Sequence, residues 1–255
     1  MTKVAALASG GLDSAIMLAD LAADSQVYPI YVEAGLVWER AEKASLERFM
    51  AALAQPNIEP VTYLSVPTGP IIGSHWSVTG QGVPGARAPD SEMFIPGRNV
   101  LLIAVTSVWC STHDVGRIAV GSLGGNPFPD ATQEFFESFG NVLSTGLGHE
   151  IKIESPFRGR NKAGLIRSHS GLPLELTLTC ANPPRPPRNA PRSSRGHPSA
   201  APRREGTQAP DARPVPDAKR PAVNDASHCG DCNKCTERLE AFQESGVEDR
   251  TRYLA

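Results

Sequence analysis

Six residues near the N-terminus, Ser9-Gly-Gly-Leu-Asp-Ser14, have the composition of an anion-binding turn. Successive glycines let backbone N–H groups converge on a phosphate, the two serines add hydroxyl donors, and a following helix directs its positive end at the same point. Asp13 would repel phosphate unless Mg²⁺ joined the two groups. No Walker lysine follows. The alternative is a plain strand–helix turn in which Asp13 or Ser14 caps the helix, but the complete pattern favours phosphate binding.

A second group of residues could hold a metal. Residues 229–235 contain Cys-x2-Cys-x2-Cys, and a tetrahedral zinc site needs a fourth ligand beside these three thiolates. An iron–sulfur cluster and a redox pair are the alternatives, but the bacterial cluster motif continues with x3-Cys-Pro after its third cysteine, and no cysteine follows Cys235. The fourth ligand could be Cys110, Cys180 or His228. Cys110 lies in an apolar run typical of a core thiol, and His228 adjoins Cys229, so Cys180, at the end of a strand-like run, is favoured. Four thiolates leave no open position, which indicates a structural zinc site.

Two further segments carry polar residues at predicted helix starts. Arg98 and Asn99 precede an apolar helix, where an arginine can pair with a phosphate or a carboxylate, or can simply be solvated beside an asparagine cap. Asp130 is predicted to cap the next helix, and Glu134 completes a capping-box pattern around Thr132. These residues are therefore either helix caps or substrate-binding groups.

Strand-like and helix-like runs alternate up to about residue 179, which predicts an α/β fold with a doubly wound, mainly parallel sheet covered on both faces. Ligands bind such sheets at the carboxyl ends of the strands, where the Ser-Gly-Gly turn lies. A long Gly/Pro-rich stretch, 67–90, is a candidate active-site loop. The expected strands are 4–8, 27–33, 61–66, 117–121 and 151–155, and the expected helices are 14–23, 38–53, 99–110, 131–143 and 161–169.

The composition predicts three segments. Residues 1–180 form the nucleotide-binding domain, 181–226 are rich in proline and arginine without aromatic residues and form a disordered insertion, and 227–255 form the C-terminal zinc-binding region. The 255 residues are 40% hydrophobic with net charge −2, which does not favour binding to nucleic acid or to a membrane surface. No membrane span and no signal peptide are evident, so we expect a cytoplasmic protein.

The Ser9–Ser14 motif resembles the PP-loop of the N-type ATP pyrophosphatases, which cleave ATP between the α- and β-phosphates to adenylate a substrate. Further segments resemble, in the same order, the motifs of the QueC/ExsB family of 7-cyano-7-deazaguanine synthases. These are FIPGRN (94–99), NPFPDATQEFFESF (126–139), LPLELTLTC (172–180) and HCGDCNKC (228–235). The resemblance covers nearly the whole chain except the predicted insertion.

This resemblance implies an adenine nucleotide alpha hydrolase-like fold that uses ATP, Mg²⁺ and Zn²⁺. It implies that a deazapurine carboxylate, 7-carboxy-7-deazaguanine, is adenylated, aminated by free ammonia to an amide, and dehydrated to the nitrile after a second activation. The residues it implies are Ala8, Ser9, Gly10, Gly11, Leu12, Asp13, Ser14 and Asn99 for the nucleotide, Asp13, Ser14, Arg98 and Asp130 for catalysis, and Cys180, Cys229, Cys232 and Cys235 for zinc.

The chain departs from the family pattern after the second expected strand. There, VEAGLVWERAE (32–42) keeps Gly35 but lacks the Gln-Arg-His that follows this glycine in many members. This leaves open a divergent enzyme that adenylates another carboxylate. Two other classes also stay open: a PP-loop enzyme that thiolates a tRNA base, and a non-catalytic nucleotide-binding partner protein. The sequence also leaves a homodimer open.

Overall fold

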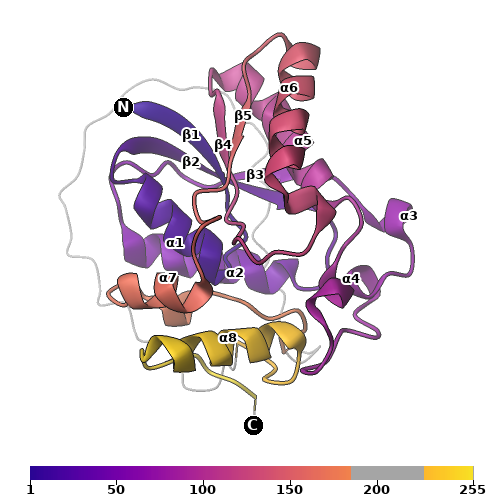
Figure 1. Cartoon of the computed structure of the whole chain (residues 1–255), viewed down its shortest axis with the longest axis vertical. Coiled ribbons are helices and arrows are strands. Elements are labelled where there is room, and N and C mark those ends of the chain that lie inside the picture. The colour runs from indigo at the N-terminus through magenta and orange to yellow at the C-terminus, as the bar shows by residue number, and fades with distance from the viewer. Residues whose placement is uncertain (185–226, 255) are drawn as a thin grey trace, which may run out of the picture. The chain divides into compact units, whose positions relative to one another are not determined.

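Five strands form one sheet in which all neighbouring strands are parallel, in the order β3-β2-β1-β4-β5 (Figure 1). The computed structural model describes residues 1–184 and 227–254. The central strand β1 pairs with β2 from Thr2 opposite Ser25 to Leu7 opposite Ile30. The strands are β1 (Thr2–Leu7), β2 (Ser25–Glu33), β3 (Thr62–Ser65), β4 (Arg117–Ala119) and β5 (Lys152–Glu154).

Helices cover both faces of this sheet, as Figure 1 shows, with α1, α2, α7 and α8 on one side and α5 and α6 on the other. The predicted doubly wound α/β fold is therefore confirmed. The helices are α1 (Leu12–Leu21), α2 (Glu39–Leu53), α3 (Gly69–Ile72), α4 (Trp76–Thr79), α5 (Arg98–His113), α6 (Gln133–Leu147), α7 (Lys162–Ser168) and α8 (Asn233–Ser245), with 3-10 turns η1 (Asp90–Met93), η2 (Pro129–Ala131) and η3 (Leu174–Leu176).

The central strand is buried on both faces because each face meets its own apolar core. Val4 and Ala6 point into one core, together with Leu165 of α7. Ala5, between them in the sequence, points into the other core, together with Phe136 of α6. Successive side chains of a strand alternate between faces, so a strand covered on both sides must be apolar throughout.

The five strands and five helices expected between residues 4 and 169 are all present, with their ends shifted by four residues or fewer. The long 67–90 segment contains two short helices, α3 and α4, and the start of η1. The strand-like prediction for the run ending at Cys180 was wrong, because this run forms η3 and an irregular segment. Its backbone groups have partners outside a sheet: Leu178 N donates to Gly10 O at 2.8 Å, and Leu174 O accepts from Arg238 Nη2 at 2.9 Å.

The C-terminal segment packs in the same compact unit as the N-terminal residues, with α8 against α7. The predicted division into three segments stays a prediction, and most of the predicted insertion lies outside the described residues. Its first residue, Ala181, is buried beside the cysteines. Among the described helices, none is both long and apolar enough to cross a membrane.

Candidate active site

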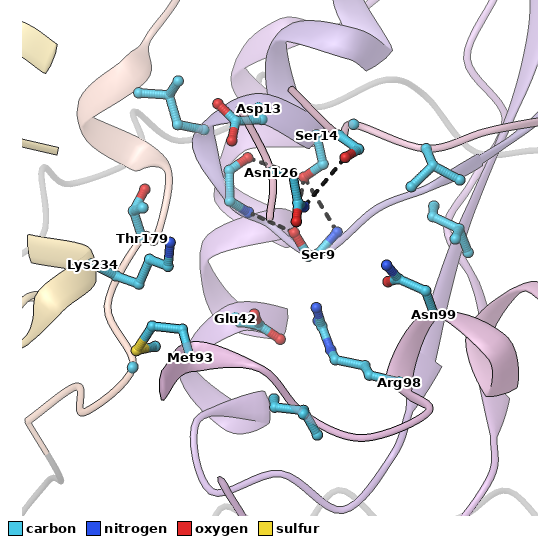
Figure 2. A pocket seen from close by; sticks show the side chains of 18 of the residues that line it. Ser9, Asp13, Ser14, Glu42, Met93, Arg98, Asn99, Asn126, Thr179 and Lys234 are labelled. Atoms are coloured by element: carbon cyan, nitrogen blue, oxygen red, sulfur yellow. Dashed lines mark hydrogen bonds between the residues drawn. The ribbon is translucent and has the colours of Figure 1, made fainter. Parts of the chain in front are cut away.

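A cavity of about 580 Å³ lies at the carboxyl ends of β1, β2 and β4, which is the edge of the sheet where the sequence predicts a ligand. Its volume is within the range of small-molecule sites. Figure 2 shows Ser9, Asp13 and Ser14 in one part of this cavity and Glu42 and Arg98 in another. We refer to the first part as the phosphate end and to the second as the ring end.

The backbone at Gly10 fixes the phosphate end against α2. Gly10 has φ +71°, and a Cβ there would lie 2.6 Å from the carbonyl oxygen of Glu42. Its own carbonyl oxygen accepts a hydrogen bond from Leu178. Glycine is therefore required at this position both by the positive φ and by the close approach of the helix. Gly10 does not itself line the cavity, whereas its neighbours Ser9 and Gly11 do.

The two serines of the loop are bonded to each other and to its backbone. Ser9 Oγ and Ser14 Oγ are 3.1 Å apart, Gly11 N donates to Ser9 Oγ at 3.3 Å, and Ser14 Oγ donates to Gly11 O at 3.0 Å. Gly11 is the N-cap of α1, and no side chain caps this helix. The alternative in which Asp13 or Ser14 is the cap is therefore wrong. The N-terminal N–H groups of α1 face the cavity without a side-chain cap, as an anion site requires.

Side chains of alternating charge lie beside the loop, and of these only Asp13 was predicted from the sequence. Lys162 Nζ lies 3.4 Å from Asp13 Oδ2 and also contacts Glu237, whose other oxygen accepts from Lys234 Nζ at 2.7 Å. Burial raises the pKa of Glu237, but the two lysines outweigh it and hold the pKa at about 2. Both lysines are therefore held at the phosphate end by ionised carboxylates.

Local sequence places Lys162 there. Asn161 caps α7 by accepting a hydrogen bond from Gly164 N at 2.7 Å, so Lys162 is the first helical residue after β5, at the same sheet edge as the Ser-Gly-Gly turn. Lys234 lies within the cysteine motif, on the first turn of α8. The signal that could have found Lys162 is its position after a strand end in a parallel sheet.

Asp13 has an oxygen suited to a cation. Its Oδ1 atom is buried and has no hydrogen-bond partner among the described residues, while Oδ2 faces Lys162. An orphaned buried carboxylate oxygen is costly. Asp13 could hold a divalent cation, which would remove that cost, so the residues present fit a metal-bound nucleotide.

Arg98 and Asn99 begin α5, and Asp130 supports them from outside the cavity. Asn99 N donates to Asp130 Oδ2 at 3.1 Å, and Asn99 Nδ2 to Asp130 O at 3.1 Å. Asp130 is 7% exposed, burial raises its pKa, and it is not among the residues that line the cavity. The predicted cap role of Asp130 on the following helix was wrong, since Thr132 caps α6 by accepting from Phe135 N. A catalytic role for Asp130 stays a prediction.

The four predicted zinc ligands lie together. Their sulfur atoms are all within 4.8 Å of one another, with Cys180 and Cys232 at 4.0 Å and Cys229 and Cys235 at 3.8 Å. Four thiolates at about 2.3 Å from one zinc ion would be separated by about 3.8 Å. The cluster could therefore bind a single zinc ion.

The two rejected candidates for the fourth ligand lie elsewhere. His228 Nε2 accepts from Thr179 N at 3.0 Å, and its Nδ1 contacts Ser227 Oγ at 2.8 Å, so both ring nitrogens have partners. Cys110 is buried in the apolar core between the sheet and α5 and α6.

A second contact fixes the C-terminal segment and was not foreseen. Arg238 of α8 is fully buried, and it donates to Thr177 Oγ1 at 2.9 Å, to Leu174 O at 2.9 Å and to Thr251 Oγ1 at 2.7 Å. It lies one turn from Lys234 and beside Glu237. The cysteines and Arg238 together hold α8 so that two of its side chains reach the phosphate end of the cavity.

A family model for the queuosine biosynthesis protein QueC matches residues 3–195. The chain belongs to the QueC family. A 7-cyano-7-deazaguanine synthase of Methanothermobacter thermautotrophicus is 22% identical over 98% of this chain and 99% of its own length. A 7-cyano-7-deazaguanine synthase of Methanocaldococcus jannaschii is 25% identical over 99% of both chains. These QueC relatives therefore also match the C-terminal segment with three of the cysteines, beyond the residues of the family model.

One solved structure was also compared. A crystal structure described as a predicted subunit of tRNA methyltransferase from Methanocaldococcus jannaschii covers 67% of this chain and 75% of its own, with a TM-score of 0.43 and 15% identity. Similarity at this level does not decide the fold. The fold of this chain follows from its own sheet order and helix layers.

Proposed function

We propose that this chain converts 7-carboxy-7-deazaguanine, ATP and ammonia to 7-cyano-7-deazaguanine. The chain belongs to the QueC family, and relatives named 7-cyano-7-deazaguanine synthase match it along nearly its whole length. Both findings support this reaction. One observation on the site supports it most directly. An orphaned carboxylate oxygen, uncapped helix N–H groups and two lysines meet at one end of the cavity, and polar groups for a second reactant lie at the other.

Adenylation needs a polarised α-phosphate and a stabilised leaving group. In the first step a carboxylate oxygen of the substrate attacks the α-phosphorus, the bond to the β-phosphate breaks, and pyrophosphate leaves. The N–H groups at Gly11 and the start of α1 would bind the leaving pyrophosphate, and Lys162 and Lys234 would neutralise its charge. Asp13 would hold Mg²⁺, which neutralises phosphate charge when it is bound.

Amide and nitrile formation follow from the acyl adenylate. Ammonia attacks the carbonyl carbon and AMP leaves, giving the amide after loss of a proton. A second ATP adenylates the amide oxygen and releases pyrophosphate, and loss of AMP and of both amide protons then gives the nitrile. The chain's part in both rounds is to hold phosphates at the same loop, so a single phosphate end serves both activations.

The cysteines have a supporting role in this proposal. Cys180, Cys229, Cys232 and Cys235 would hold zinc with no open position, so the ion fixes α8 and the lysine it carries. A reducing cytoplasm would keep these thiols available to a metal.

The test is incubation of the purified protein with ATP, Mg²⁺, ammonium and 7-carboxy-7-deazaguanine, followed by mass analysis. We expect the nitrile, with about two AMP per nitrile. Amide alone would indicate a different product, and absence of AMP would refute the enzyme proposal. Stimulation of AMP release by tRNA without any deazapurine would favour the tRNA-modifying alternative instead.

A further inference from the structure

The ring end of the cavity contains a buried carboxylate without an ionic partner. Glu42 is 9% exposed and lines the cavity from the first turn of α2. Tyr31 donates a hydrogen bond to its Oε2 atom at 2.9 Å. Among the described residues, no lysine, arginine or histidine nitrogen lies within 4.0 Å of it. The donors beside this carboxylate, the Tyr31 hydroxyl and the Trp38 indole, are both neutral, and a carboxylate can accept further hydrogen bonds from a ligand.

A guanidinium faces the same space. Arg98 lines the cavity from the start of α5, and its Nε atom is buried with no hydrogen-bond partner in the described part of the chain. Figure 2 shows the side chains of Arg98 and Glu42 pointing into the same part of the cavity. The two are close enough for Arg98 to lower the pKa of Glu42, but they form no ion pair. Unpaired buried polar groups of opposite charge are costly, which indicates that a ligand completes both.

The walls at this end are aromatic. Trp38, one turn before Glu42 on α2, is 6% exposed and stacks on Trp76 with ring centroids 5.5 Å apart at 28°. Both tryptophans line the cavity, together with Ile95. Such walls suit a flat heteroaromatic ring, whose faces are apolar and whose edges carry polar groups.

We propose that Glu42 and Arg98 recognise the edge of a guanine-type ring, with the carboxylate accepting from the ring N–H and 2-amino group and the guanidinium donating to the ring oxygen. A guanine-type edge places an acceptor beside two donors, which matches a guanidinium beside a carboxylate. An adenine-type ring has an amino donor where the guanidinium would need an acceptor. This inference rests on the proposed function. It assigns the ring end to 7-carboxy-7-deazaguanine, so the adenine of ATP would bind in another part of the cavity.

Two residues of the ring end lie where this chain departs from the family pattern. Trp38 and Glu42 both belong to the 32–42 segment, where this chain lacks the Gln-Arg-His of many family members. The altered segment therefore supplies one wall and one polar group of the ring end. We infer that ring recognition in this chain depends on Trp38 and Glu42 of the altered segment.

The experiment compares the wild type with Glu42→Gln, and uses Glu47→Gln, an exposed residue of the same helix, as the matched control. We expect Glu42→Gln to raise the KM for 7-carboxy-7-deazaguanine about 10- to 100-fold, while the KM for ATP changes less than about threefold. A substrate lacking the 2-amino group should show a smaller difference between the two proteins, because it has already lost one of the bonds. Glu47→Gln should match the wild type.

A rise in the KM for ATP instead of the acid would assign Glu42 to adenine and overturn the inference, as would unchanged kinetics in Glu42→Gln. Calorimetric binding of 7-deazaguanine and of adenine separates this inference from the proposed function. If the wild type makes no nitrile yet binds 7-deazaguanine in a Glu42-dependent way, the proposed reaction fails and the ring subsite stands. If the wild type neither turns over the acid nor binds 7-deazaguanine, both fail.

Discussion

The two ends of the cavity solve opposite electrostatic problems. At the phosphate end Lys162 lies between two carboxylates, Asp13 and Glu237, so its charge is neutralised before any ligand arrives. At the ring end Glu42 and Arg98 share a cavity without forming an ion pair. Paired charges can contribute to the stability of the fold, whereas unpaired buried charges reduce it and gain their partners only from a ligand. Replacing glutamate by glutamine should therefore lower the free energy of unfolding at the phosphate end, at Glu237, and raise it at the ring end, at Glu42.

The largest expected effect is the loss of activity when Asp13 is replaced by alanine. Asp13 lines the cavity and its Oδ1 atom is orphaned, so Asp13→Ala should lower AMP release about a thousandfold, because the Mg²⁺ that we propose it holds would lose its protein ligand. Pyrophosphate and AMP release report the change. A folded Asp13→Ala variant with more than about a tenth of wild-type activity would contradict this role, and thermal unfolding shows whether it is folded.

The next largest effect concerns the cysteines that fix α8. Cys232→Ala should remove about one zinc ion per chain and lower the free energy of unfolding by more than about 4 kcal/mol, because metal binding supplies folding energy. Elemental analysis and urea denaturation measure both quantities. Cys110→Ala is the matched control, since Cys110 is equally buried but lies in the apolar core. Equal zinc contents in the two variants would show that the cluster does not hold the ion.

The backbone turn of the phosphate end could be predicted from the sequence, whereas its two lysines and most of the ring end could not. The Ser9–Ser14 motif acts through backbone N–H groups and φ angles, which local sequence determines. Arg98 was identified from its motif, but its relation to Glu42 was not. Glu42 lies on a helix that packs beside Gly10, and only the packing of α2 on the sheet places it in the cavity. A glutamate in an otherwise amphipathic helix gives no sign that it is buried.

The same distinction holds for the fold. The strands and main helices follow from hydrophobic periodicity, and their alternation determines a parallel sheet. The run ending at Cys180 was misassigned because its apolar residues contact the loop and α8 and do not pair with a strand. Arg238 was missed because an arginine within a charged helix is normally solvated, and its burial depends on oxygens supplied by Leu174, Thr177 and Thr251.

A smaller effect is expected when the paired charges of the phosphate end are broken. Glu237→Gln leaves Lys162 with Asp13 alone and should lower the free energy of unfolding by about 2–3 kcal/mol, less than for a fully buried pair because the Glu237 side chain is 30% exposed. Glu240→Gln, at an exposed position of the same helix, should change it by less than about 0.5 kcal/mol. Equal stabilities for the two variants in urea denaturation would contradict the distinction between the ends.

The smallest expected effect has the opposite sign, and it occurs at the ring end. Burial and, more weakly, the nearby Glu39 raise the pKa of Glu42, and Arg98, Tyr31 and Trp38 lower it, which leaves the pKa at about 7. The folded chain thus retains a proton that the unfolded chain releases at about pH 4.5, so this group's contribution to stability falls as the pH rises from about 4.5 to 7. The glutamine of Glu42→Gln cannot ionise, so this variant does not lose stability over that pH range.

Relative to the wild type, Glu42→Gln should therefore gain about 2 kcal/mol in the free energy of unfolding between pH 5 and pH 8, measured by urea denaturation without ligand. Tyr31→Phe, which removes one of two neutral donors, should lose stability at pH 8, because the ionised carboxylate then keeps only the indole of Trp38 as a donor. A Glu42→Gln variant that is less stable than the wild type at pH 8 would show that the carboxylate is already satisfied in the free protein. A Glu42→Gln variant that is more stable than the wild type but has a higher KM for 7-carboxy-7-deazaguanine would show that the ionised carboxylate destabilises the free protein. It would also show that the substrate supplies the hydrogen bonds that this carboxylate lacks.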